Sequence, residues 1–410
     1  MNESRVKYDF ETILDRSGDS SKWAQMREKK PEVPDGIVPL SVADMEFKSP
    51  PEVTEGLREY LKDAILGYPC ASERVYQAVL SWVKKHCHWI AEREWLVFTP
   101  GVVNGFFQAV RAFTEPGDGV IVMPPVYYPF YSAVTRNDRK LRCCPLKEEK
   151  DGWNIDYERL ERLAKEDNAR LLILCSPHNP VGRVWTAEEL SRLGEICLKN
   201  QVFVVSDEIH CDLIMPGFSF TSFGSLRKEV KDNAMVCLSP SKTFNLAGLE
   251  SSCIFIPNAG RRQRFLTELA KTGQMNRLNS IGFQAMELAY TKGEAWLTQL
   301  IQTIEENHRF TKEYLKNRCP KIRVGELQGT YLEWIDLRAF GWNPQEQERI
   351  MLDADLFFDE GSLFGKEGEG FERMNLACPR KVLENALERL CAALEKADID
   401  RTERRSFREQ

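Results

Sequence analysis

The sequence has little of what marks disulfide-built, membrane-spanning or nucleic-acid-binding proteins. Its twelve cysteines are scattered along 410 residues and include no Cys-x-x-Cys pair, so reduced thiols are expected rather than a disulfide framework. Lys and Arg number 56 against 62 Asp and Glu, and the net charge of −6 argues against a nucleic-acid partner. Apolar runs such as Leu171–Leu174 are far too short to cross a membrane.

The first residues, Met1–Lys7, contain no apolar stretch of the kind that forms a signal peptide, which together with reduced thiols favours a cytoplasmic protein. One local cluster, His86-Cys87-His88, has the residue types of a metal site. Its neighbours Val79–Val83 are typical of a helix, in which adjacent side chains point apart, and no second ligand cluster is in sight. We therefore expect no bound metal, with Cys87 buried and both histidines in solvent.

What the middle of the sequence does contain is an alternation of short apolar runs with amphipathic stretches such as Ala187–Leu198. The runs are apolar on both faces and end at Pro, Ser or Asp, which is typical of buried strands. This predicts an α/β domain with a mostly parallel sheet, and ligand chemistry should gather at the carboxyl ends of its strands. The predicted strands are Leu96–Phe98, Val120–Met123, Leu171–Leu174, Val202–Val205, Val236–Leu238 and Cys253–Ile256.

The C-terminal part follows a different pattern. A long helix is predicted from Glu294 to Asn317, then a strand around Thr330–Ile335 and a final helix over Val382–Leu394. The charged tail from Asp398 onward is expected to be frayed. The predicted boundaries are 48–293 for a large domain, and 1–47 with 294–410 for a smaller α/β domain.

Lys242 stands out among the residues that follow the predicted strands. It comes shortly after Val236–Leu238, among small hydroxylated residues. A lysine at the mouth of a buried strand loses its proton more easily than one in water, and a neutral amine attacks carbonyl groups. Lys242 is therefore a candidate Schiff-base lysine, although taken alone it has the features of an ordinary surface lysine.

A glycine-led helix follows the strand Leu96–Phe98. Gly101 lets the backbone approach a ligand, and the N–H groups of Val102 and Val103 in the first turn suit a phosphate. Strand–Gly–helix turns are also common without any phosphate. The predicted apolar face of this helix is Val103, Phe106, Phe107, Val110 and Phe113.

Three further strand ends carry polar or aromatic groups. Asp207 closes one strand and either caps the next turn or faces a cationic heteroaromatic nitrogen, and His210 follows in the same turn. Asn179 is held extended by the proline after it, so its amide is available to a ligand oxygen, unless it serves only the turn. Tyr127 either stacks on a planar ring or is a rim or core aromatic.

A phosphate nest, an aromatic ring, an amide, an acid and a lysine together fit one cofactor. Pyridoxal 5′-phosphate (PLP) carries an aldehyde, a pyridine nitrogen and a phosphate, and its protein signature is a lysine Schiff base with an acidic partner for the ring nitrogen. The sequence therefore predicts PLP bound at Lys242 and Asp207.

These motifs, in this order, resemble fold-type I PLP enzymes of the class I/II aminotransferase superfamily over nearly the whole chain. More closely, the sequence is similar to the MalY/PatB-type carbon–sulfur lyases, often called cystathionine β-lyases. The resemblance implies a large domain with a mostly parallel seven-stranded sheet and helices on both faces. The segments that carry it are Ser41–Phe47, Gly101–Gly105, Cys175–Pro180, Gly182–Thr186, Ser206–His210 and Ser241–Asn245.

The resemblance also implies roles for individual residues. Lys242 would bind the cofactor aldehyde and Asp207 the pyridine nitrogen, with His210 nearby. Asn179 would contact the ring oxygen and the substrate, and Arg373 would hold the substrate α-carboxylate. The remaining cofactor contacts implied are stacking by Tyr127, phosphate binding by Val102, Val103 and Ser239, and a phosphate contact from Tyr68 to the neighbouring subunit of a homodimer.

One position departs from the common aminotransferase pattern. Glu250 stands where many of those enzymes place a phosphate-binding arginine, eight residues after the lysine. MalY/PatB-type lyases tend to lack this arginine too, so the departure favours the lyase branch. The predicted function is PLP-dependent cleavage of cystathionine, cysteine or S-substituted cysteines to a thiol, pyruvate and ammonia. The alternatives are an aminotransferase and a non-catalytic PLP-binding regulator.

Overall fold

The computed structural model describes residues 7–150 and 152–408, with side chains up to Ile399. The chain divides into two compact units. The larger comprises Ser49–Thr298 and Gln328–Thr330, and the smaller comprises Met1–Lys48, Gln299–Leu327 and Tyr331–Gln410. The domain boundaries given above stay a prediction.

The larger unit is built on a seven-stranded sheet with the order β1-β9-β8-β7-β6-β2-β3. Strand β9 pairs antiparallel with β1 and β8, whereas the other four pairings are parallel. The predicted α/β class with a mostly parallel sheet is confirmed. The strands are β1 (Leu96–Thr99), β2 (Gly119–Val122), β3 (Lys140–Cys143), β6 (Ala169–Cys175), β7 (Phe203–Asp207), β8 (Ala234–Leu238) and β9 (Ser252–Phe255).

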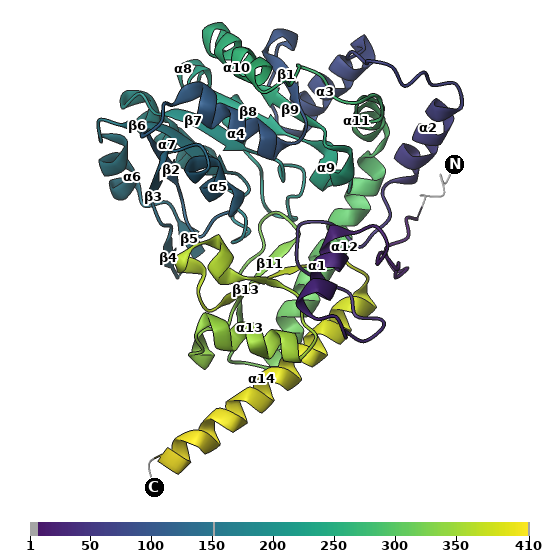
Figure 1. Ribbon diagram of the computed structural model, residues 1–410, viewed down its shortest axis with the longest axis vertical. Coiled ribbons are helices and arrows are strands. Elements are labelled where there is room, and N and C mark those ends of the chain that lie inside the picture. Colours follow the sequence, from purple (N-terminus) through teal and green to yellow (C-terminus); the bar gives the residue numbers. More distant parts are fainter. Residues whose placement is uncertain (1–6, 151, 409–410) are drawn as a thin grey trace. The chain divides into compact units, whose positions relative to one another are not determined.

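Helices cover both faces of this sheet (Figure 1). One face carries α4 (Val102–Phe113), α5 (Pro129–Thr135) and α10 (Ala259–Lys271), and the other carries α6 (Tyr157–Ala164), α7 (Ala187–Lys199) and α8 (Lys228–Asp232). The unit also contains α2 (Pro51–Lys62), α3 (Glu73–His86), α9 (Pro240–Thr243), α11 (Ser280–Lys292), the hairpin β4 (Lys147–Glu149) and β5 (Gly152–Asn154), and the 3-10 turns η1 (Arg93–Trp95), η2 (Phe223–Ser225) and η3 (Ala247–Leu249).

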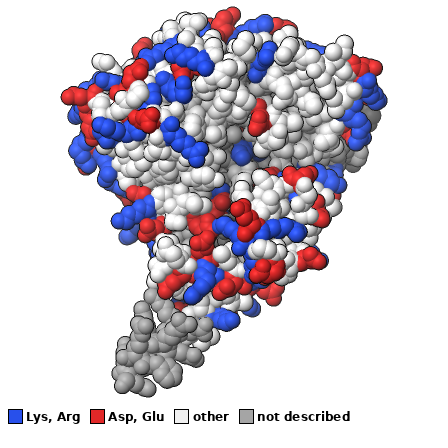
Figure 2. Space-filling view, viewed as in Figure 1, with Lys and Arg blue, Asp and Glu red and all other residues white. Residues whose placement is uncertain are grey.

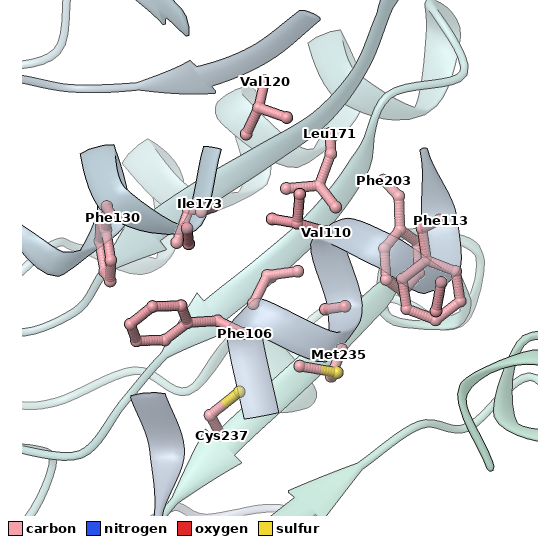
Figure 3. Close-up of a cluster of buried hydrophobic side chains, with 14 of the residues drawn as sticks. Phe106, Val110, Phe113, Val120, Phe130, Leu171, Ile173, Phe203, Met235 and Cys237 are labelled. Atoms are coloured by element: carbon pink, nitrogen blue, oxygen red, sulfur yellow. The ribbon is translucent and has the colours of Figure 1, made fainter. Parts of the chain in front are cut away.

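Helix α4 supplies the centre of the core (Figure 3). Its buried side chains pack on alternate residues of β6, β7 and β8, because those residues share one face of the sheet. The predicted apolar face is wrong at Val103, which is 40% exposed, while Val102 is 3% exposed. A stripe through Val102, Phe106, Ala109 and Phe113 follows the 3.6-residue period, and Val103 falls outside it.

The smaller unit has an antiparallel sheet of order β10-β11-β13-β12. The predicted long helix and the strand after it are confirmed as α12 and β11. The elements are α1 (Ser21–Lys29), α12 (Glu294–Arg318), β10 (Arg323–Val324), β11 (Leu332–Asp336), η4 (Arg338–Phe340), α13 (Pro344–Asp353), β12 (Asp359–Glu360), η5 (Gly361–Phe364), η6 (Lys366–Gly368), β13 (Phe371–Asn375) and α14 (Arg380–Arg408). The start of α12, up to Thr298, belongs to the larger unit.

The last helix corrects a prediction. Helix α14 runs to Arg408, so the predicted helix end at Leu394 and the frayed tail are both wrong for the backbone up to that residue. The reason is in the sequence, because no Gly or Pro interrupts the segment between Arg380 and Arg408.

The cysteines and the charged surface follow what the composition predicts. All twelve cysteines are free thiols. Among the described residues, no helix combines the length and the apolar character needed to span a bilayer. Positive and negative side chains are interspersed on the face drawn in Figure 2.

Candidate active site

Chemically active residues follow four parallel strands of the larger unit. Strands β6, β7 and β8 are neighbours, and β1 runs in the same direction because β9 is antiparallel to both β1 and β8. Their carboxyl ends therefore lie along one edge of the sheet. Asn179, Asp207, Lys242 and the start of α4 each follow one of these ends.

Lys242 lies on α9, a helix of a single turn directly after β8. Its side chain is half-buried. The lysine charge is close enough to Asp207 to lower the pKa of that carboxyl. The structure thus brings together the amine and the acid that the sequence singled out.

Asp207 ends β7 and is buried. Its Oδ1 accepts a hydrogen bond from the backbone N–H of Ile209 at 3.2 Å. Burial raises the pKa of Asp207 to about 7, against the opposing effects of this hydrogen bond and of Lys242. A cation placed beside the carboxylate would stabilise its charged form, which is what a protonated pyridine nitrogen offers.

Asn179 and Tyr127 are neighbours, because the backbone N–H of Tyr127 donates to the carbonyl of Asn179 at 3.1 Å. Asn179 is buried, and the half-buried ring of Tyr127 makes an edge contact with Phe130, with ring centroids 5.8 Å apart. Two strand ends are therefore joined at the residues predicted to hold the ring.

His178 is a residue near the site that the sequence motifs did not indicate. It is buried, and its Nε2 donates to the carbonyl of Pro125 at 2.9 Å. Burial lowers the pKa of His178 to about 4, so the ring is neutral at pH 7. His178 ties the turn that carries Asn179 to the segment that carries Tyr127, a long-range contact that no local pattern indicates.

The first turn of α4 has the geometry expected of an anion site. Gly101 is the N-cap with φ +84°, in the left-handed region that favours glycine. The first helical bond comes from Gly105 N–H to the carbonyl of Gly101 at 3.2 Å, so the N–H groups of Val102 and Val103 precede the hydrogen-bonded ladder. Asn104 Oδ1 in the same turn is buried and has no hydrogen-bond partner.

Ser239 caps α9. Its Oγ accepts from Ser241 N–H at 3.0 Å and lies 2.6 Å from the carbonyl of Ser251. Ser241 Oγ is 2.8 Å away and was not among the predicted residues, because nothing in the sequence distinguishes it from its neighbours. Ser251 Oγ is buried without a hydrogen-bond partner. Polar hydroxyls therefore cluster where a phosphate contact is predicted.

The other predicted residues occupy varied positions. His210 is buried in the turn after β7, whereas Tyr68 is 92% exposed with the Arg277 guanidinium 4.9 Å from its ring centroid. Glu250 is exposed in a left-handed conformation after η3. In His86-Cys87-His88, the expected exposure is wrong for His86, which is half-buried and stacked on Trp82.

Arg373 belongs to the smaller unit and lies on β13. It is buried, its Nη2 donates to Asp359 of β12, and its guanidinium lies 4.7 Å from the ring centroid of Phe364. Asp359 also accepts from the backbone N–H of Val42 at 2.9 Å. No sequence pattern indicates Asp359, because its pairing with Arg373 depends on the strand register.

The donor set of the larger unit fits PLP. An amine suits the aldehyde, a buried acid suits the ring nitrogen, and a helix N-terminus with hydroxyls suits the phosphate. The partnerless buried oxygens of Asn104 and Ser251 are polar atoms that await a partner.

The family profile described as "Aminotransferase class I and II" matches residues 35–390. The chain belongs to this family. The membership predicted from the sequence motifs is confirmed, as is the fold-type I architecture, because aminotransferase class I and II relatives share the sheet and helix arrangement seen here.

Among aminotransferase class I and II relatives, the chain is 41% identical over 358 residues to "Cystathionine beta-lyase PatB" of Bacillus subtilis, covering 87% of this chain and 92% of that one. The structure of cystalysin from Treponema denticola, which contains a pyridoxal 5′-phosphate cofactor, aligns with a TM-score of 0.94 and 44% identity over 96% of this chain and 100% of that one. A PLP-bound C–S lyase of Staphylococcus hominis aligns with a TM-score of 0.87 and 31% identity over 95% and 98% of the two chains.

Proposed function

We propose that this protein is a PLP-dependent carbon–sulfur β-lyase that converts cystathionine, cysteine or S-substituted cysteines to a thiol, pyruvate and ammonia. The observation that carries the proposal is the pairing of Lys242 and Asp207 at adjacent strand ends, in a chain whose relatives are named as C–S lyases. The relatives support the lyase branch that the sequence motifs predict.

Each residue of the larger unit then has a task. Lys242 would hold the cofactor aldehyde, and its free amine would take the proton from the substrate Cα. Bound PLP supplies a ring that accepts the negative charge left at Cα. Asp207 keeps a proton on the ring nitrogen, since burial disfavours its own charge until a cation is beside it. The thiolate would then leave Cβ with the electron pair of the C–S bond as the Cα–Cβ double bond forms. Water would hydrolyse the released imine to pyruvate and ammonia.

The remaining assignments orient the reactants. Asn179 contacts the ring oxygen and the substrate, Tyr127 stacks on the ring, and His210 lies close by. The first turn of α4 at Val102 and Val103, together with Ser239, holds the phosphate. Arg373 binds the substrate α-carboxylate with its planar guanidinium.

We also propose that the enzyme works as a cytoplasmic homodimer. Four apolar or aromatic side chains are exposed in the larger unit at the end of α2 and on the segment after it, and exposed apolar patches mark interaction surfaces. Tyr68 is one of them and would reach the phosphate of the partner subunit. The exposed side chains are Leu61, Ile65, Leu66 and Tyr68.

The test separates the lyase from an aminotransferase. Purified protein loaded with PLP is given cystathionine alone and, separately, an amino acid with a 2-oxo acid. We expect pyruvate and a thiol from cystathionine without any 2-oxo acid. Transfer of the amino group to the 2-oxo acid, without pyruvate release from cystathionine, would overturn the proposal.

A further inference from the structure

A buried carboxylate contacts Thr243, the residue that follows Lys242. Asp212, in the turn after β7, is 7% exposed and accepts hydrogen bonds from two side chains on different helices. Thr243 Oγ1 donates to its Oδ2 at 2.7 Å, and Trp82 Nε1 donates to its Oδ1 at 3.0 Å. Thr243 is fully buried and is the residue next to Lys242 on α9.

Helix α9 depends on such side-chain anchors because it is only four residues long. One turn of helix is unstable by itself, since its few backbone bonds do not compensate the ordering of the chain. The helix begins at the cap formed by Ser239, and its last residue, Thr243, is held by Asp212. Lys242 lies between these two anchors.

The surroundings of Asp212 come from several elements. On α3, His86 lies near the carboxylate, and its ring stacks on Trp82 with centroids 3.8 Å apart. Burial raises the pKa of Asp212, and the charge of His86 and the Thr243 and Trp82 donors oppose that rise. The other titratable groups facing it are Cys211 beside it, Cys87 after α3 and Tyr290 on α11.

We propose that Asp212 is a positioning residue for Lys242, acting through its hydrogen bond to Thr243. The inference rests on the proposed function, in which the Lys242 amine must meet first an aldehyde carbon and then the substrate Cα proton. A displacement of about 1 Å in a reacting group lowers a rate by about a hundredfold. Holding both ends of α9 fixes the origin of the lysine side chain for both tasks.

The test uses Thr243→Val, which keeps the shape of the side chain and removes its hydroxyl, with Thr243→Ser as the conservative variant that restores it. Asp212→Ala is less informative, because it leaves two buried donors without an acceptor and lowers folding stability. Ser222→Ala is the matched control, since Ser222 Oγ also donates to a buried carboxylate, that of Glu208, at 2.6 Å.

Two readouts are needed, and one does not involve catalysis. In cofactor-free protein, amide hydrogen exchange of the α9 residues should become faster in Thr243→Val and stay native in Thr243→Ser and Ser222→Ala. In the loaded enzyme, kcat for pyruvate release should fall about ten- to a hundredfold in Thr243→Val, with KM changed less than threefold, and recover in Thr243→Ser.

Native kcat in Thr243→Val overturns the positioning role, whether or not the exchange of α9 changes. An equal loss of kcat in Ser222→Ala also overturns it, because the effect would then be general destabilisation. Failure of the proposed function gives a different result, namely a Lys242→Ala variant that still releases pyruvate at the native rate.

Discussion

Buried charges are treated in opposite ways in two regions of the molecule. In the smaller unit, the N-terminal block Ser41–Phe47 is held by an ion cluster in which Lys22 is fully buried. Its Nζ lies 2.5 Å from Glu46 Oε1 and donates to the carbonyl of Asp44 at 2.7 Å. Arg16 pairs with Asp44 and Glu46 at 3.0 and 3.2 Å.

In the larger unit, Asp207 ends β7 and Glu208 follows it, and both carboxyls are buried. Burial raises the pKa of both Asp207 and Glu208 to about 7. Glu208 is nevertheless satisfied by three donors, Ser206 Oγ, Ser222 Oγ and Phe223 N–H. Asp207 accepts one backbone bond and feels the charge of Lys242.

This difference in how the buried charges are paired distinguishes residues that hold the fold from residues that are available to a ligand. A buried charge that is paired inside its own unit holds the fold, and removing its partner is costly. A buried acid whose pKa is raised is instead ready for a cation brought by a ligand. The ion cluster therefore gives the Ser41–Phe47 block a structural role, whereas the raised pKa of Asp207 supports the cofactor contact proposed for it.

The largest effect is expected from Lys242→Ala. Removing the amine takes away both the attachment of the cofactor and the base for the Cα proton, so pyruvate release should fall about 10³-fold or more. Mass spectrometry after borohydride reduction should find the cofactor on the native chain and not on the variant. Lys228→Ala, at an exposed lysine, is the control and should behave as native. Native activity in Lys242→Ala would contradict the chemical role proposed for the buried acid and the lysine of the larger unit.

Lys22→Met tests whether the ion cluster of the smaller unit stabilises the fold. It leaves Glu46 buried with one cation fewer, so the free energy of unfolding should fall by about 3–5 kcal/mol, measured by urea denaturation. The folded fraction should keep the native kcat. Lys29→Met removes a half-exposed partner of Glu360 and should lower the free energy of unfolding by less than about 1 kcal/mol. Equal effects of the two substitutions would show that the burial of Lys22 is of no consequence.

The strand ends show how far the sequence reaches. The apolar runs before Asp207 and Lys242 predict parallel strands, and residue chemistry at their ends predicts the cofactor, because both signals are local. Strand β3 was missed since it is a half-exposed edge strand with charged residues at Lys140 and Arg142. Its pattern lacks the continuous apolar run of a central strand.

Contacts between polar residues that are far apart in the chain could not be predicted from the sequence, for a physical reason. The bond from Thr243 to Asp212 and the pair of Arg373 with Asp359 join residues that are close only after folding. Composition and periodicity report which face of an element is buried, and they do not report which polar group meets which. The half-buried position of His86 was mispredicted for the same reason.

Asp207→Asn should stabilise the cofactor-free protein at alkaline pH. The pKa of Asp207 is raised from 3.8 to about 7, so its contribution to stability is fully present below pH 3.8 and is lost as pH rises through 7. Urea denaturation at pH 8 should find the variant more stable by about 2 kcal/mol, about half of the upper bound of 4 kcal/mol, with a smaller difference at pH 5.

Glu208→Gln is the matched variant for that experiment. Burial also raises the pKa of Glu208 to about 7, so removing its charge relieves part of the same cost at pH 8. The variant places an amide N–H₂ against one of the three donors of Glu208, so the gain in stability should be smaller than for Asp207→Asn. A smaller gain would sharpen the distinction between a satisfied acid and one that awaits a cation. An equal or larger gain would break it.

The smallest effect is expected from His178→Phe, which tests a buried group that avoids charge altogether. The variant leaves the carbonyl of Pro125 without its donor, so at pH 7 the free energy of unfolding should fall by about 1–2 kcal/mol.

The pKa of His178 is lowered from 6.5 to about 4, so its contribution to stability is present above pH 6.5 and is lost as pH falls through 4. The deficit of the variant should therefore shrink at pH 5, because native protein loses about 2 kcal/mol there relative to a chain without this histidine. His88→Asn, at an exposed histidine in a left-handed conformation that asparagine tolerates, is the control and should change the free energy of unfolding by less than about 0.5 kcal/mol. An equal deficit of His178→Phe at pH 7 and pH 5 would mean that the buried ring accepts a proton without loss of stability. His178 would then not be a buried group that is stable only when neutral.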